Sequence, residues 1–142
     1  ILLNYAEAMV NAYGDPDYTG SYSLSARDAV NQVRNRGDVK MPAYPADMSK
    51  DAFLKRLKNE RRVEFAFEGQ RFWDLRRWKL GEKYFGVYPR GLNVEATKDE
   101  DFFKDTQMTS HIREFRTPAN YLMPIPVDQV SNNPQMVQNP GY

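Results

Sequence analysis

The chain has 142 residues, a formal net charge of +1 and no cysteine, and 41% of its residues are hydrophobic. This composition is typical of a folded domain with a core, and the absence of cysteine excludes disulfides and thiolate metal sites within these residues. Because 20 basic side chains nearly balance 19 acidic ones, the net charge gives no reason to expect a nucleic-acid partner. No apolar run is long enough to span a bilayer.

Residues 1–37 predict a helical hairpin. Their helical pattern begins at the first residue without a Met or a cap, so we expect the chain to be the C-terminal portion of a longer protein. Gly14 is placed to end the first helix, Ser25 and Asp28 form a capping-box pattern for the second, and Gly37 is placed to close it. Two amphipathic helices joined by a short loop are expected to be antiparallel, as in a tetratricopeptide-like unit.

Residues 48–80 predict further helices. The segment before these helices, residues 39–46, contains Pro42 and Pro45 and is predicted to be a linker on the surface. Ser49 is a suitable N-cap for a helix that runs to about Phe67. After Gly69, residues 70–78 predict one more short helix.

Residues 81–142 predict a long irregular segment. Residues 84–89 have strand-like residue types in a short run. Pro124 and Pro126 lack the N–H that a central strand needs, so residues 121–126 are expected to be extended and to lie on the helices. Residues 128–130 are expected to form at most a single turn. The predicted fold is therefore mainly α, a single C-terminal domain over residues 1–142 with a long irregular C-terminal wrap.

One face of the third predicted helix is apolar near its start and carries charged residues further along. On a 3.6-residue wheel, the apolar stripe that begins at Phe53 continues into acidic and basic side chains. A buried charge is costly unless it is paired, so we predict a structural ion network inside the fold, flanked by buried aromatic side chains. The alternative is a solvated face with weak surface pairs. The predicted network consists of Glu60, Arg61 and Glu64, with Arg71 or Arg76 as further cations.

The residue types give little support for catalysis or for metal binding. His111 is the one histidine, and without cysteine we predict no transition-metal site and no cofactor. Glu60, Glu64 and Glu68 could imitate a glycosidase carboxylate pair, but such a pair faces across a cleft, whereas these lie on one helix. The basic and aromatic residues 71–79 could bind nucleic acid by stacking and charge. Near-zero net charge and buried aromatic packing argue against that reading.

Two separated motifs resemble one known family. Residues 59–78, NERRVEFAFEGQRFWDLRRW, strongly resemble the NERR-E-AFEG-RF-DLRRW signature of the SusD/RagB family. Residues 121–126, YLMPIP, and 138–142, QNPGY, resemble that family's C-terminus, and residues 4–8 and 30–36 are similar to its last helical-repeat region. The resemblance covers nearly the whole chain in the right order.

The resemblance implies a mainly α lipoprotein at the surface of the outer membrane of Bacteroidetes-type bacteria. Members bind glycans or other nutrients without catalysis and act as a lid on a SusC-type TonB-dependent transporter. The lipidated cysteine of the family is N-terminal and is absent from these 142 residues, so the anchor is expected outside this chain. The family's ligand-contacting residues also lie largely outside this portion, so the resemblance assigns no ligand-binding residue here.

The sequence therefore leaves three alternative hypotheses for the function. The first is non-catalytic binding of a nutrient, most simply a glycan, in association with the transporter, by aromatic stacking on sugar rings and polar contacts to hydroxyls. The second is a helical-repeat interaction module without a small ligand, which the hairpin of residues 1–37 suggests. The third is a glycoside-processing enzyme that uses Glu60 or Glu64.

Overall fold

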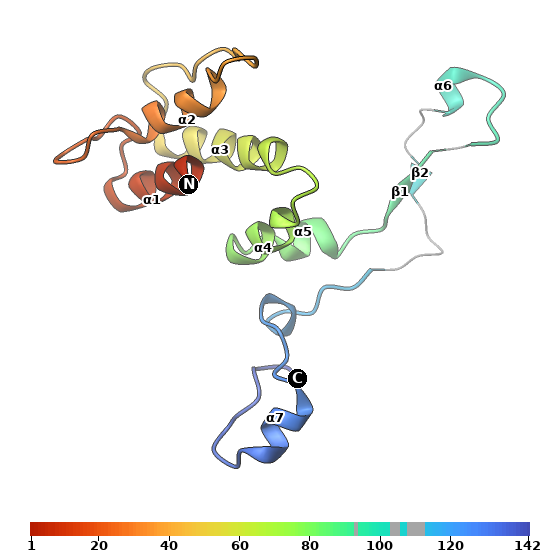
Figure 1. The fold of residues 1–142 in the computed structure, drawn as a ribbon. Helices are drawn as coiled ribbons and strands as arrows, with labels where there is room; N and C mark the ends of the chain where they lie inside the picture. Colours follow the sequence, from red (N-terminus) through yellow and green to blue (C-terminus); the bar gives the residue numbers. More distant parts are fainter. Residues whose placement is uncertain (93, 103–105, 108–112) are drawn as a thin grey trace. The chain divides into compact units, whose positions relative to one another are not determined.

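The fold is given by a computed structural model, which describes residues 1–92, 94–102, 106–107 and 113–142; His111 lies outside them. The described chain is mainly helical, as predicted, and forms two compact units, Ile1–Arg71 and Phe72–Tyr142 (Figure 1). Its α-helices are α1 (Leu2–Tyr13), α2 (Ala26–Arg34), α3 (Lys50–Glu64), α4 (Gln70–Arg77), α5 (Gly81–Phe85), α6 (Asp99–Phe102) and α7 (Val127–Asn132). The strands β1 (Arg90–Gly91) and β2 (Thr106–Gln107) pair antiparallel.

The predicted helix caps of the first unit are confirmed. Gly14 adopts φ 80° after α1, a left-handed conformation that glycine reaches without steric cost, and its N–H donates to the Val10 carbonyl. At the start of α2, Ser25 and Asp28 form a capping box, and the Ser49 side chain accepts from the Ala52 N–H at the start of α3. The predicted helix ends were too late, because α2 already ends at Arg34 and α3 at Glu64.

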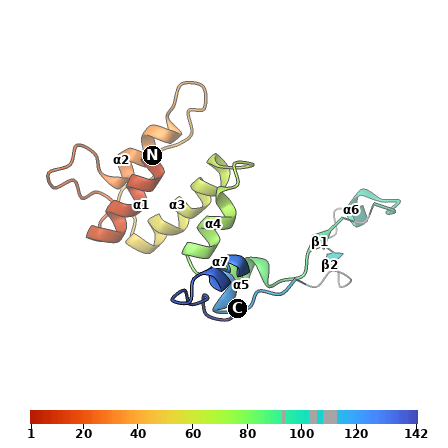
Figure 2. The same cartoon turned by 60° about the horizontal axis from the view of Figure 1, so that its bottom comes forward.

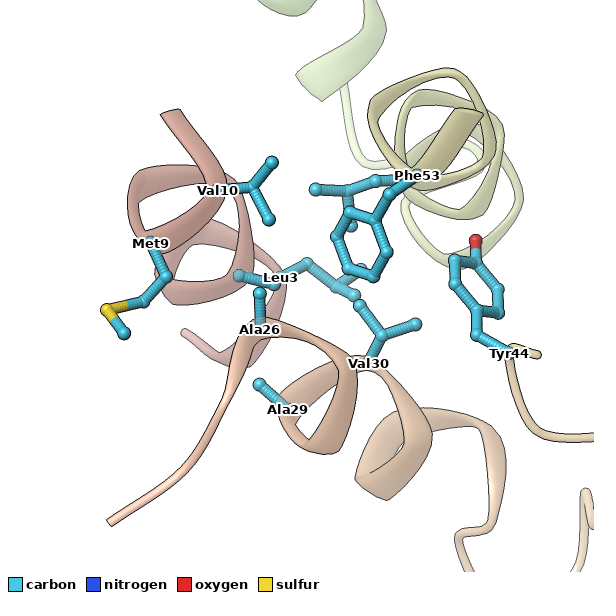
Figure 3. Close-up of a cluster of buried hydrophobic side chains, with 10 residues drawn as sticks. Leu3, Met9, Val10, Ala26, Ala29, Val30, Tyr44 and Phe53 are labelled. Atoms are coloured by element: carbon cyan, nitrogen blue, oxygen red, sulfur yellow. The ribbon is translucent and has the colours of Figure 1, made fainter. Parts of the chain in front are cut away.

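The core of the first unit lies between α1, α2 and α3, which are side by side in both views (Figure 2). Helix α3 contributes Phe53 and Leu57, both essentially inaccessible to solvent. Alanines of α1 and α2 reduce the width of the contact and allow these helices to approach closely. The buried cluster consists of Leu3, Ala6, Met9, Val10, Ala26, Ala29, Val30, Tyr44, Phe53 and Leu57 (Figure 3).

Tyr44 corrects the prediction of a simple surface linker before α3. Its side chain is buried and packs edge-on against Phe53, with 5.6 Å between the ring centroids. Its backbone N–H donates to the Asn31 side chain at 2.8 Å. A proline-containing linker therefore supplies one of the core residues, which its composition did not indicate.

The second unit contains α4, α5 and the C-terminal segment. The strand-like reading of residues 84–89 is wrong at its start, because Tyr84 and Phe85 belong to α5. The Tyr84 N–H donates to the Leu80 carbonyl at 3.2 Å, so a local helical bond overrides the β-propensity of these residues. The Phe115 ring packs between Phe85 and Tyr121, at centroid distances of 5.9 and 4.8 Å.

The C-terminal segment folds back on itself within the second unit. Gln138 bonds to both the N–H and the carbonyl of Ile125, at 2.8 Å each, and the Asn139 amide donates to the Met123 carbonyl at 2.6 Å. Helix α7 has six residues and is longer than the predicted single turn. Leu122 and Met123 are exposed despite their apolar character, so polar contacts rather than burial of these side chains hold residues 121–126.

Candidate functional site

The structure places Glu60 at the junction of α2, α3 and the linker. Glu60 Oε2 accepts from Arg34 Nη1 at 2.5 Å and from the Tyr44 hydroxyl at 3.3 Å. Burial, together with the negative charge of Glu60, raises the pKa of Tyr44 well above its ordinary value. Glu60 is therefore a buried carboxylate that is bonded to a guanidinium and a hydroxyl.

Arg61 connects α3 to α1. Its side chain is 5% exposed, its Nη1 donates to Asn4 Oδ1 at 2.5 Å, and its Nε lies 3.9 Å from Glu7 Oε2. The guanidinium also lies over the Phe65 ring, 5.0 Å from its centroid. Arg61 thus combines an ionic, a polar and an aromatic contact in the interior of the first unit.

Glu64 forms a more exposed pair one turn further along α3. It pairs with Arg36, whose side chain is 47% exposed, and the hydrogen bond to Glu64 raises the pKa of Arg36. Sequence reasoning did not name Arg34 or Arg36 as partners. Arg34 is the last residue of α2 and Arg36 follows the helix, so the only signal in the sequence was their positive charge near the end of a neighbouring helix.

Arg71 and Arg76, the two further cations predicted for the network, do not appear in the contacts described for Glu60 and Glu64. Arg76 is buried in the second unit and donates to the backbone carbonyls of Tyr121, at 3.4 Å, and Leu122. Arg71 is half-buried near the start of α4. That Arg71 or Arg76 serves Glu60 and Glu64 stays a prediction.

These contacts pair the predicted acidic side chains of α3 with arginines. Glu60 and Glu64 are each bonded to an arginine, whereas a glycosidase pair needs carboxyl groups that face a substrate. Glu68 is exposed after the end of α3. Among the described residues, Asp and Glu side chains do not gather in a group that could hold a metal ion.

The aromatic side chains around the signature differ from the expectation of burial. Phe67, Phe72 and Trp73 are all exposed, and Phe67 is fully so. Phe67 has a positive φ of 66° between α3 and α4, in a turn where its side chain finds no neighbour to pack against. The signature therefore presents part of its aromatic surface instead of burying it.

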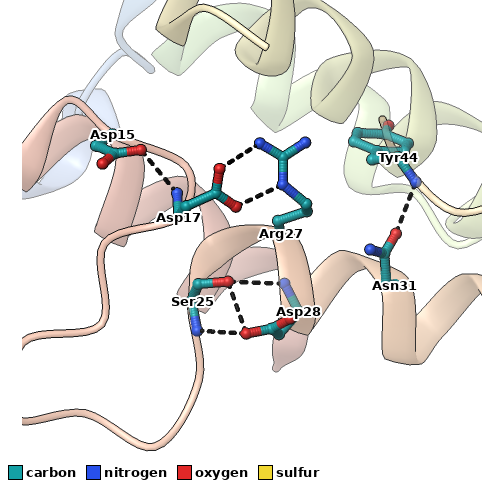
Figure 4. A network of polar contacts seen from close by, with 7 residues as sticks. All are labelled: Asp15, Asp17, Ser25, Arg27, Asp28, Asn31 and Tyr44. Atoms are coloured by element: carbon teal, nitrogen blue, oxygen red, sulfur yellow. Dashed lines mark hydrogen bonds and ion pairs between the residues drawn. The ribbon is translucent and has the colours of Figure 1, made fainter. Parts of the chain in front are cut away.

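Polar contacts order the loop between α1 and α2 (Figure 4). Arg27 holds Asp17 at two points, with Nε to Oδ1 at 2.5 Å and Nη2 to Oδ2 at 2.6 Å. The guanidinium keeps the pKa of Asp17 below its ordinary value. The Asp17 N–H donates to Asp15, and Ser25 and Asp28 bond reciprocally where the loop enters α2. The loop is thus fixed at both ends.

This loop and α1 together form a tyrosine cluster, which we define as Tyr5 and Tyr13 of α1 with Tyr18 and Tyr22 of the loop. The rings of Tyr13 and Tyr18 are stacked with centroids 4.2 Å apart, and the hydroxyls of Tyr13 and Tyr22 are 3.3 Å apart. Tyr13 is 44% and Tyr22 48% exposed. The cluster therefore offers aromatic surface and hydroxyl groups to the solvent.

A second feature of the first unit is a groove between α2 and the linker that follows it, which we call the α2 groove. It has a volume of about 590 Å³. Four polar side chains, from Asp28, Asn31, Gln32 and Asn35, line it at the spacing of one helix face. Leu24 and, from the linker, Met41 and Ala43 complete its walls. Sequence reasoning missed this groove, because it depends on where the linker lies.

Comparison with known proteins places this geometry in a family. The model of the SusD family matches residues 1–142, the complete chain. The chain belongs to the SusD family. The SusD signature of residues 59–78 comprises the end of α3, the whole of α4 and the turn between them, and the tetratricopeptide-like description agrees with the packed helices of the first unit.

Individual SusD relatives agree in sequence and in structure. The chain is 30% identical to SusD-like protein P2 of Formosa agariphila over 148 residues, which cover 100% of this chain and 26% of that protein. It is similar to the solved structure of BT4246, with a TM-score of 0.79, 38% identity, and coverage of 99% of this chain and 22% of the other. A second solved structure, of selenomethionine BT4246, gives a TM-score of 0.73 and 36% identity. The chain thus spans about a quarter of the length of these relatives.

Proposed function

We propose that this SusD-family protein binds a nutrient, most simply a glycan, at the surface of the outer membrane. It does so without catalysis and in association with a SusC-like TonB-dependent transporter in the same membrane. The observation that carries the proposal is the match of the SusD family model over all of residues 1–142. No helix in the described part of the chain has the length and apolar character needed to cross a bilayer; a lipid anchor outside this chain supplies the attachment in our proposal.

The tyrosine cluster supports the carbohydrate part of the proposal. Sugar rings carry C–H groups on their faces, and these can pack on the apolar face of an aromatic ring. A tyrosine adds a hydroxyl group that can form hydrogen bonds. Tyr13, at the end of α1, and Tyr22, in the loop that follows it, provide such rings in the first unit. Exposed aromatic groups of this kind mark binding surfaces.

The paired glutamates support the absence of catalysis. A general acid has to reach the glycosidic oxygen, while a second carboxylate attacks or activates water from the other side. Glu60 is buried among Arg34 and Tyr44, and Glu64 is held by Arg36. We therefore assign both to the packing of α3 against α2.

The proposal is tested by titrating the full-length protein with a panel of glycans while the mixture is analysed for shortened products. Saturable binding with intact glycan is the expected result. Products that disappear in the Glu64→Gln variant would contradict the non-catalytic assignment. No binding to any glycan or other nutrient, together with stable capture of a protein partner, would favour a helical-repeat interaction module instead.

The transporter association needs its own measurement. Affinity purification of the full-length protein from outer membranes is expected to retain a TonB-dependent β-barrel, and protease added to intact cells is expected to digest the protein. Recovery without any β-barrel, or complete protection from the added protease, would contradict this part of the proposal.

A further inference from the structure

The α2 groove has walls that are fixed before any ligand arrives. The linker is pinned beside α2 by three hydrogen bonds: Met41 N–H to the Arg34 carbonyl at 2.9 Å, Arg34 Nε to the Pro42 carbonyl at 2.7 Å, and Tyr44 N–H to Asn31 Oδ1 at 2.8 Å. The buried ring of Tyr44 adds an anchor in the core. A ligand that enters the groove therefore need not order its walls, which removes one cost of binding.

The opposite end of the groove is fixed as well. Leu24 precedes the capping box, in which Ser25 and Asp28 exchange hydrogen bonds of 2.8–3.2 Å. The Leu24 carbonyl also accepts from the Tyr5 hydroxyl at 2.6 Å. At about 590 Å³, this rigid groove has the size of a small-molecule site.

The lining of the α2 groove selects a class of ligand. Gln32 and Asn35 are exposed, and neither side chain has a hydrogen-bond partner among the described residues. Each amide can donate and accept at once, as a sugar hydroxyl also can. The lining contains no Lys or Arg, and its carboxylate, Asp28, already accepts from Ser25. Such a lining suits a neutral polyhydroxyl ligand and offers no cation to a phosphate or carboxylate group.

We propose that the α2 groove is a binding subsite for a neutral oligosaccharide, with Gln32 and Asn35 bonding to its hydroxyls and Leu24 and Met41 contacting the apolar face of a sugar ring. This inference rests on the proposed function, since it gives a location and a ligand class to nutrient binding within this chain. The tyrosine cluster adjoins the Leu24 end, because Tyr5 bonds to Leu24 and its ring lies edge-on to that of Tyr22 at 6.5 Å.

An extended peptide fits the α2 groove less well. Peptides bind along open strand edges by backbone hydrogen bonds. Here the Met41 N–H, the Pro42 carbonyl and the Tyr44 N–H are already bonded to α2. These three backbone groups of the wall are thus occupied, whereas the exposed side-chain amides of Gln32 and Asn35 can bond to hydroxyl groups.

The experiment uses photoreactive derivatives of neutral gluco-, manno- and galacto-oligosaccharides with the full-length protein. A galacturonate oligosaccharide and a polar peptide that carry the same diazirine serve as competing probes. After irradiation, mass spectrometry locates the labelled segments. The test variant is Gln32→Ala with Asn35→Ala. Its matched control is Gln70→Ala with Asn59→Ala, which removes the same two exposed amides elsewhere in the first unit.

We expect a neutral probe to label residues 24–43. Loss of two hydrogen bonds should weaken this labelling about tenfold in the test variant, while the control variant keeps it and both melt like the parent protein. Neutral oligosaccharides that bind and label only other segments would overturn the subsite and leave the proposed function standing. Equal labelling of residues 24–43 by the acidic probe or by the peptide would overturn the ligand class. Absence of any saccharide binding would instead overturn the glycan part of the proposed function and the subsite with it.

Discussion

Arginine side chains in this chain join elements that lie apart in the sequence. Arg34 binds Glu60 of α3 with one nitrogen and the Pro42 carbonyl of the linker with another, at 2.5 and 2.7 Å. Arg27 holds Asp17 of the preceding loop at two points. The planar guanidinium presents several donors in fixed directions, so one side chain can fix two groups. Lysine, as a single point charge, could not reproduce these contacts.

Arg61 and Arg62 allow a direct test at this scale. Arg61 is buried against Asn4, Glu7 and Phe65, whereas Arg62 is exposed on the other side of α3. We expect Arg61→Ala to lower the free energy of unfolding by about 3 kcal/mol, because it strands groups that the guanidinium satisfies. Arg62→Ala should change it by less than about 0.5 kcal/mol. Urea denaturation of both variants measures this, and equal small losses would show that Arg61 is effectively solvated.

The contact between Asp17 and Arg27 predicts a pH dependence. Arg27 lowers the pKa of Asp17 in the folded protein, whereas the unfolded chain has the ordinary value of about 3.9. The contact therefore stabilises the fold above about pH 4, and this contribution is lost as the pH falls through the lower folded pKa. We expect the stability difference between the parent and Asp17→Asn to disappear in acid. Chemical denaturation across the pH range checks this, with the exposed Asp38→Asn as the control; a difference that persists in acid would contradict the assignment.

At the scale of elements, nearby residues determine where the helices of the first unit begin and end, whereas contacts between distant residues determine how the helices pack. Ser25, Ser49 and Gly14 act on backbone groups within four residues of themselves, which fixes where helices begin and end. Their mutual arrangement depends instead on the buried cluster and on contacts such as that between Arg34 and Glu60.

Ser25 and Ser23 test the capping box. The Ser25 side chain accepts from the Asp28 N–H at 3.0 Å, while Ser23 is exposed in the loop. We expect Ser25→Ala to destabilise the protein by about 1 kcal/mol, the usual cost of losing an N-cap, and Ser23→Ala to be neutral. Thermal unfolding followed by circular dichroism compares the two. Identical melting curves would mean that the cap does not contribute to stability.

The same division explains what could be predicted from the sequence. Helix caps and the apolar stripe of α3 could be read because neighbouring residues determine them. The burial of Tyr44 could not, because it depends on the Asn31 side chain, 13 residues earlier in the chain. The α2 groove could not be predicted either, since its wall exists only where the linker is pinned. Tyr84 and Phe85 were predicted to be strand-like but belong to α5. The prediction failed because β-propensity reflects the packing environment more than an intrinsic preference of the backbone.

On the scale of the whole molecule, the two units are built by different means. The first has an apolar cluster between three helices. The second relies on a chain of aromatic rings, Phe72, Phe85, Phe115 and Tyr121, and on polar contacts to the backbone of its last residues. Gly81 lets this chain of rings pack closely, because a Cβ at this position would lie 2.2 Å from Phe115 Cζ and the ring would have to move. The SusD signature contributes residues to both units.

Arg76 and Arg77 test how the second unit holds its last segment. Arg76 is buried and donates to the carbonyls of Tyr121 and Leu122, whereas Arg77 is partly exposed and pairs with Asp74. We expect Arg76→Ala to speed amide hydrogen exchange throughout residues 119–126, because those carbonyls lose a charged donor. Arg77→Ala should leave that segment unchanged. Mass-spectrometric exchange resolves the segment, and equal protection in both variants would refute the anchoring role.

The sequence separation of contacts in the first unit also predicts an order for the steps of its folding. The pair Arg27–Asp17 closes a loop of 10 residues and Tyr5–Leu24 one of 19, whereas the contacts of α3 close longer loops, of 26 residues for Arg34–Glu60 and 57 for Arg61–Asn4. Contacts that close short loops form early, because less chain entropy is lost before they are made. We therefore expect α1 and α2 to associate in the transition state and α3 to dock after it. Stopped-flow measurements should then show Ser25→Ala slowing refolding and Arg61→Ala accelerating unfolding instead.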